Sequence, residues 1–226
     1  MIKFLPVLLA LAWVGLMLAQ SVWRTKAMLA AQSTPLTDPA LLAEVVPLMR
    51  ALDLPSLDLR VFEQPGVNAL AAPDGRVYLT RGMVAAFGAG QITGPEIASV
   101  VAHELGHLSL GHLRRRMVDF TGQNMVLVLL GGVLARFVPG VGVALARLAS
   151  SALMAHLSRR DEFEADEFAA ALLVKAGIGT APQRQLLAKL GGANAVQGGT
   201  AAWLMSHPPA AERIKAIAAA EAKWGV

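Results

Sequence analysis

Two histidines and a glutamate stand within five consecutive residues, as His103, Glu104 and His107. An α-helix turns about 100° per residue, so side chains four positions apart leave nearly the same face. Two imidazoles on one face can bind zinc, and a glutamate beside the first ligand can act on a water at the remaining coordination position. We therefore predict that His103 and His107 bind zinc and that Glu104 is the catalytic base, the arrangement of a metalloprotease helix.

The residues before this motif predict the helix independently. Thr93 and Glu96 have the spacing of a capping box, Pro95 stands in the first turn, and an apolar run follows. The alternative is an ordinary amphipathic helix that carries the motif by chance. Two ligands do not complete a site, so the rest of the chain must supply a third.

The third ligand must be a histidine or a carboxylate, because the chain has no cysteine. Residues 158–173 are predicted to form a helix with a dense acidic start, in which Glu162 and Glu164 compete as ligands. Asp166 lies one turn after Glu162 on the same face, where it could accept the second ring N–H of a ligand histidine. We predict that Glu162 is the third ligand, that Asp166 supports a ligand histidine and that Glu164 is solvated.

Two further histidines fit the metal face poorly. His112 follows His107 by five residues, about 140° away on a continued helix, so it is predicted to be a surface residue or to support a ligand. The extended metzincin spacing would need a histidine at Leu113, so that arrangement is absent. His156 lies about 120° from the face of Glu162 and is predicted to be structural.

The composition points towards lipid. Of 226 residues, 55% are hydrophobic, the mean hydropathy is +0.52 and the net charge is +4. Much of the basic excess, at 114–116 and 159–160, flanks apolar stretches, which fits anionic headgroups or a solvated basic face. No aromatic and basic reading surface accompanies it, so we predict no nucleic-acid partner.

The N-terminus carries an apolar run from Phe4 to Ala19. Its length suits a signal peptide, and with Val22 and Trp23 it approaches that of a membrane anchor. We expect residues 1–26 to be one or the other, 27–38 to be a linker and 39–226 to form the main domain. In either case the chain is exported.

Short β-rich runs lie at 57–62, 67–71 and 76–80, separated by Pro-Gly and Asp-Gly turns. They predict a small antiparallel meander before the metal helix. Substrates of such sites add to an edge strand, for which Asn68, Ala69 and Leu70 are the candidates, against the alternative of an interior strand.

Two apolar segments, 125–135 and 137–146, are separated by Arg136. Each is too short to span a bilayer, so a helical hairpin over 125–146 is expected. This hairpin either packs on the core or dips into a membrane surface.

Several motifs in order resemble peptidase family M48: the His103–His107 stretch, 158–166 and 206–214, with 68–71 and 75–82 before the metal helix. The resemblance covers about 37–217. It implies an α+β, mostly α-helical, zincin-like domain with a small antiparallel sheet and an N-terminal hydrophobic helix. It also implies one Zn²⁺ per chain, held by His103, His107 and Glu162, with Glu104 as base.

The same resemblance draws attention to His207 and Arg213. In some family members the histidine of the His-Pro segment can approach the zinc, and the arginine commonly lies near the cleft. Both are therefore tentative catalytic residues that could assist the oxyanion. His207 could equally belong to a turn that leads into a helix at 210–222.

The resulting hypothesis is a zinc endopeptidase of the compact cell-envelope branch of this family. It would act on misfolded or membrane-associated proteins in the bacterial envelope and contact the membrane through its N-terminal segment and the 125–146 hairpin. One rival is a catalytically silent zinc protein that works as a chaperone-like adaptor. Another is an anchored structural module that binds no metal.

Overall fold

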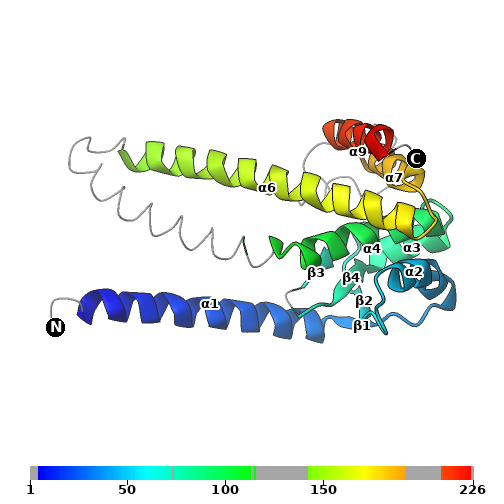
Figure 1. Cartoon of the computed structure of the whole chain (residues 1–226). Coiled ribbons are helices and arrows are strands. Elements are labelled where there is room, and N and C mark those ends of the chain that lie inside the picture. Colours follow the sequence, from blue (N-terminus) through cyan, green and yellow to red (C-terminus); the bar gives the residue numbers. More distant parts are fainter. Residues whose placement is uncertain (1–4, 73, 113–114, 116–141, 192–209, 225–226) are drawn as a thin grey trace.

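The helix that carries the two histidines lies between a small sheet and the long helix that carries Glu162 (Figure 1). The computed structural model describes residues 5–72, 74–112, 115, 142–191 and 210–224. Its elements, in order, are α1 (Leu5–Ala31), β1 (Ser33–Pro35), α2 (Pro39–Ala51), β2 (Leu59–Phe62), β3 (Ala69–Ala71), β4 (Val77–Thr80), α3 (Arg81–Gly88), α4 (Gly94–Ser109), α6 (Gly142–Lys175), α7 (Ala181–Gly191) and α9 (Ala210–Trp224). The mostly helical α+β class predicted from the sequence is confirmed.

Helix α1 reaches further than expected. It continues to Ala31, and β1 begins at Ser33, so the segment 27–38 predicted as a linker carries regular structure. Leu29, near the end of α1, is buried in a cluster with Phe62 and Tyr78. That burial ties the end of the helix to the sheet. Among the residues whose side chains the structure describes, no helix is both long and apolar enough to cross a bilayer.

The sheet is mixed, with strand order β1-β2-β4-β3. Asp74 and Gly75 do form a hairpin turn, and β3 pairs with β4 in antiparallel fashion. The preceding turn does not make a hairpin, because β2 pairs with β4 in parallel and β3 lies beyond β4. The predicted antiparallel meander is therefore wrong in the order of its strands and in the direction of the β2–β4 pairing.

The reason for this order is the burial of β4. Val77, Tyr78 and Leu79 are all fully buried, so this strand has an apolar residue on both faces. A strand of this kind is stable in the middle of a sheet, whereas short β3, with Leu70 partly exposed, can stand at the edge. The prediction that 67–71 contains an edge strand is confirmed.

Helix α4 is the central element of the site. Thr93 and Glu96 form the predicted capping box, and Pro95 stands in the first turn. Every residue from Glu96 to His107 is buried, since α2, the sheet, α6 and α7 contact this helix from several sides. Such burial removes the conformational freedom of the side chains that α4 presents.

Close packing of α4 on α6 brings the two halves of the site together. A Cβ added to Gly106 would lie 3.0 Å from the backbone oxygen of Ala165 and 3.1 Å from its Cα. The glycine thus lets the helices approach between the histidines of α4 and the acidic residues of α6.

Helix α6 also changes the expectation for the preceding segment. It is a single helix of 34 residues that begins at Gly142, well before the start predicted at 158. Residues 142–146, expected in the second arm of a hairpin, belong to this helix. The rest of the 125–146 segment lies outside the described residues.

Candidate metal centre

His103 and His107 lie one turn apart on α4 and point to the same place. Their Nε2 atoms are 3.1 Å apart, and both side chains are buried. Glu162 of α6 completes the group, with Oε2 3.3 Å from His103 Nε2 and Oε1 3.4 Å from His107 Nε2. These three side chains are among the groups whose donor atoms are close enough to hold a metal ion.

The spacing of these donor atoms suits zinc. A tetrahedral zinc ion with bonds of about 2.0–2.1 Å holds its ligand atoms about 3.3–3.4 Å apart. The three measured separations, 3.1–3.4 Å, lie close to this value. Two imidazoles and one carboxylate are also a common zinc set when a fourth position is left for water. The side chains therefore fit the metal that the sequence predicts.

Glu104 is buried on the same helix, between the two histidines in sequence. Its Oε1 atom has no hydrogen-bond partner among the residues that the structure describes. A buried carboxylate oxygen without a partner is costly, and active sites are one place where such groups occur. A water at the metal position would supply the missing donor.

A carboxylate supports His103 from behind. Asp166 Oδ1 lies 3.0 Å from His103 Nδ1, on the side of the ring away from the ligand group. Arg213 of α9 holds this carboxylate with two hydrogen bonds, Nε to Oδ2 at 2.6 Å and Nη2 to Oδ1 at 2.7 Å. Gln183 of α7 donates to the same Oδ1 at 3.3 Å. Three helices thus fix the orientation of one imidazole.

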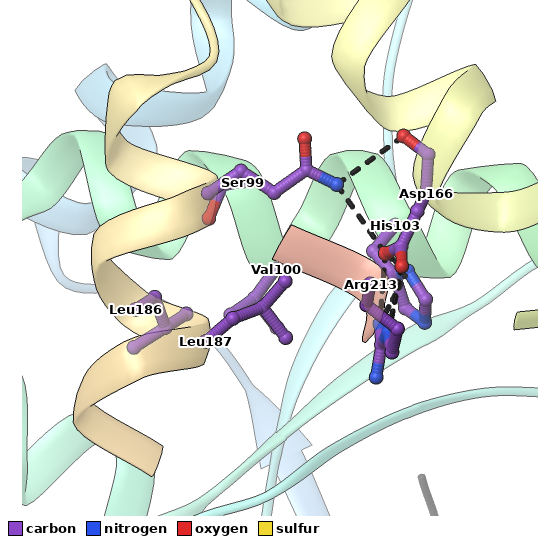
Figure 2. A pocket seen from close by; sticks show the side chains of 8 residues that line it. Ser99, Val100, His103, Asp166, Leu186, Leu187 and Arg213 are labelled. Atoms are coloured by element: carbon purple, nitrogen blue, oxygen red, sulfur yellow. Dashed lines mark hydrogen bonds and ion pairs between the residues drawn. The ribbon is translucent and has the colours of Figure 1, made fainter. Parts of the chain in front are cut away.

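Figure 2 shows His103, Asp166 and Arg213 at one end of a small cavity whose other end is lined by Leu186 and Leu187. The cavity holds about 10 Å³, which is room for one water molecule at most. It is a packing space behind the candidate metal ligands and is too small for a peptide.

The charges in this group reinforce one another. Burial opposes the charged form of His103, but hydrogen bonds with Asp166 and Glu162 raise its pKa to about 9. Burial also opposes the charged form of Asp166, yet hydrogen bonds from Arg213 and His103 lower its pKa to about 2. Asp166 therefore remains a carboxylate at neutral pH, able to accept the Nδ1 proton of a ligand histidine.

Arg213 lies deeper than the sequence suggests for a residue at a cleft. Its side chain is 2% exposed, and Nη1 is 3.6 Å from Glu162 Oε2. The other guanidinium nitrogens face Asp166. This position suits a role in holding the ligands more directly than contact with a substrate.

His112 is buried, so the surface position, one of its two predicted alternatives, is wrong, and its contact with His107 agrees with the other alternative, support of a ligand. Its Nδ1 atom is 2.9 Å from His107 Nδ1. The helical projection failed because α4 ends at Ser109 and Gly111 takes a left-handed conformation, with φ of +67°. A glycine just after a helix is the usual sign of such an ending, and it could have been read from the sequence.

Glu164 is not simply solvated, as the sequence predicted. It accepts hydrogen bonds from Arg160 at 2.8 Å and from Arg115 at 3.2 Å, and His112 Nε2 lies 3.2 Å away. The hydrogen bond from Arg160 is the largest of the effects that lower the pKa of Glu164 to about 2. Glu164 therefore contacts His112, whereas Glu162 is the glutamate that lies against His103 and His107.

The predicted substrate strand packs on the helix that carries the two histidines. β3 is at the sheet edge and contacts α4. Asn68, just before it, is fixed by three hydrogen bonds with Thr80, and its own Oδ1 accepts from the Ala69 amide. His207 lies outside the described residues, and His156 belongs to α6, but the structure does not describe its side chain.

Comparison with known proteins agrees with this geometry. The chain is 29% identical to metalloprotease LoiP of Escherichia coli over 167 residues, which are 71% of this chain and 61% of that protein. It is 31% identical to metalloprotease YcaL of Escherichia coli over 169 residues, again 71% and 61%. Protease HtpX of Pseudomonas putida is 26% identical over 211 residues, 78% of this chain and 70% of that protein. The chain thus spans about three fifths of the first two relatives.

Residues 35–221 match the family model described as Peptidase family M48. The matched range includes all of α4 and the part of α6 that carries Glu162, so it contains the three side chains that converge on the candidate centre. Since it also covers most of the sequence, as the resemblance of the motifs implied, the chain belongs to peptidase family M48.

Proposed function

We propose that this protein is a zinc-dependent endopeptidase that hydrolyses peptide bonds in protein substrates. The observation that carries the proposal is the geometry of three buried donors, on His103, His107 and Glu162, at the separation that tetrahedral zinc requires. Membership of a peptidase family supports it.

Glu104 is the proposed general base. When bound, zinc lowers the pKa of water and polarises a carbonyl group. Glu104 Oε1, which lacks a partner among the described residues, would take the proton of the attacking water and pass it to the leaving nitrogen. Burial of Glu104 excludes competing solvent and keeps its carboxylate in place.

The extended substrate is proposed to add to β3. A peptide can bind as a further strand along the outer side of an edge strand, through main-chain hydrogen bonds. Asn68, Ala69 and Leu70 would form this surface. His207 is kept as a candidate near the oxyanion, while Arg213 is proposed to position Asp166 and, through it, His103.

The proposed site of action is the bacterial cell envelope, with misfolded or membrane-associated proteins as substrates. Helix α1 supports membrane association because it exposes several large apolar side chains, which are Leu9, Trp13, Leu16 and Trp23. Fractionation tests this part of the proposal. A chain that starts at Ala27 keeps buried Leu29 and should leave the membrane fraction, whereas the full chain should stay in it.

The substitution Glu104→Gln tests the enzyme itself. We expect the variant to bind zinc as the parent does and to lose at least about 100-fold in casein cleavage, because the base is gone. Glu167→Gln, at an exposed position of α6, is the matched control and should cleave normally. Full activity of Glu104→Gln would refute the mechanism. An inactive parent that binds zinc and suppresses aggregation, unaffected by Glu104→Gln, would favour the chaperone-like adaptor.

A further inference from the structure

The two ligand histidines have different supports. His103 meets a carboxylate directly, at Asp166. His107 instead meets a second imidazole, since its Nδ1 atom lies 2.9 Å from Nδ1 of His112. The two rings are nearly perpendicular, at 72°, with centroids 5.0 Å apart. His112 is completely buried, so no solvent competes for this contact.

The contact dictates where the protons lie. His107 points Nε2 at His103 and Glu162, so a metal there takes the Nε2 lone pair and leaves the proton on Nδ1. That N–H can donate to Nδ1 of His112, 2.9 Å away, when this nitrogen of His112 carries no proton. His112 must therefore carry its own proton on Nε2.

The far side of His112 satisfies this requirement. Its Nε2 atom lies 3.2 Å from Glu164 Oε2 and 4.0 Å from Asp161 Oδ1. Arg115 is 3.2 Å from both carboxylates, and Arg160 also donates to Glu164 at 2.8 Å. The acceptor of the His112 proton is thus itself held in place by two guanidinium groups.

We propose that His112 is a positioning residue of the metal centre, which fixes the tautomer and ring orientation of His107 through a hydrogen-bond chain from His107 through His112 to Glu164. The proposal rests on the proposed zinc centre. Partners of this kind commonly change metal affinity by about 10- to 100-fold when they are lost. The last member of this series of hydrogen bonds, the carboxylate of Glu164, belongs to α6, the helix that also carries the proposed ligand Glu162.

The same side chains could suggest a separate cation site, because donor atoms of His112, Asp161 and Glu164 lie close together. Arg115 argues against this. Its guanidinium already lies 3.2 Å from both carboxylates and supplies the positive charge that a metal would bring. The contact of His112 with His107 also places its ring against the main centre.

Zinc affinity of the full chain, measured by competition with a coloured chelator near neutral pH, tests the proposal without a substrate. His112→Phe keeps an aromatic ring but has no acceptor for the His107 proton, and should bind zinc about 10- to 100-fold more weakly. His112→Asn can place its Oδ1 where Nδ1 stood, and should stay within about threefold of the parent.

A backbone variant gives an independent test. Gly111 and Gly90 both follow helices, have φ of +67° and +69°, and have free space where a Cβ would be added. Alanine at either position should lower the melting temperature of the metal-free chain similarly. Only Gly111→Ala should weaken zinc binding, because only Gly111 returns the chain to place His112.

The outcomes separate cleanly. Parent-like zinc affinity in folded His112→Phe would overturn the proposal, and so would equal losses in the phenylalanine and asparagine variants. Two zinc ions per chain, with one lost in the His112 variants, would also overturn it in favour of a separate site. If His112→Phe does not fold, the zinc affinities of His112→Asn, Gly111→Ala and Gly90→Ala still test the proposal. A folded parent that binds no zinc would instead refute the proposed function.

Discussion

Replacing Arg213 with methionine should loosen the metal centre although none of the three ligands changes. The guanidinium donates to both oxygens of Asp166, at 2.6 and 2.7 Å, and both side chains are 2% exposed. Its removal leaves the buried carboxylate of Asp166 with only part of the hydrogen bonding and positive charge that stabilise its charged form. Breaking a buried pair from one side costs about 3–5 kcal/mol. In a chain of this size, that lowers the melting temperature by on the order of 10 °C.

Thermal unfolding of the metal-free full chain is the first measurement, and zinc affinity is the second. The affinity should also fall, by about tenfold, because Asp166 would no longer be held against His103 Nδ1. Arg184→Met is a suitable control. Arg184 of α7 pairs with Glu221 of α9 at 3.3 Å, but the pair is partly exposed, so its loss should cost no more than about 1 kcal/mol.

The competing hypothesis from the sequence is that Arg213 assists the oxyanion. Under that hypothesis Arg213→Met would lower kcat while the melting temperature and zinc affinity stayed at parent values. That combination would refute the positioning role. A loss of stability and zinc affinity together would support it.

Three further predictions concern the ligand, acid stability and packing. Glu162→Ala should lose zinc in elemental analysis, whereas Glu164→Ala should keep about one zinc per chain, and the opposite pattern would exclude the assigned ligand. Since the pKa of Asp166 is lowered from 3.8 to about 2, its carboxylate stabilises the fold above about pH 4. That contribution, about 2 kcal/mol, should be lost as the pH falls towards 2, as followed by urea unfolding with Asp166→Asn as reference. Gly82→Ala should destabilise by about 1–3 kcal/mol, because its Cβ would overlap the backbone of a neighbouring loop, whereas Gly88→Ala, with open space, should be neutral or slightly stabilising in the same assay.

The helix that bears the histidines could be predicted because its signals are local. The capping box at Thr93 and Glu96, the proline after it and the four-residue spacing of His103 and His107 all act within one helix. Local chemistry also favoured Glu162 over Glu164, since Asp166 follows it by one turn. The structure brings Glu162 to the two histidines and Asp166 behind His103, although their roles stay predictions until zinc is measured.

The sheet shows where such reasoning stops. The turn at Gly75 was correctly placed, because a left-handed residue marks a tight connection. The position of β4 between β2 and β3 depends on which strand is buried on both faces. Whether a strand is buried on both faces depends on α4 and on the rest of the core. The positions of the turn residues alone therefore could not predict the order of the strands.

The sequence by itself determined which chemical groups stand together: an imidazole pair, a glutamate beside it and an acidic helix with a further carboxylate, because helical periodicity and side-chain type are properties of short segments. Tertiary structure decided which groups stand behind those ligands. Arg213, 47 residues after Asp166, is buried against it. His112 reaches His107 only because Gly111 ends the helix and turns the chain back. Contacts of this kind depend on how whole helices pack, and packing arises only when the chain folds as a unit.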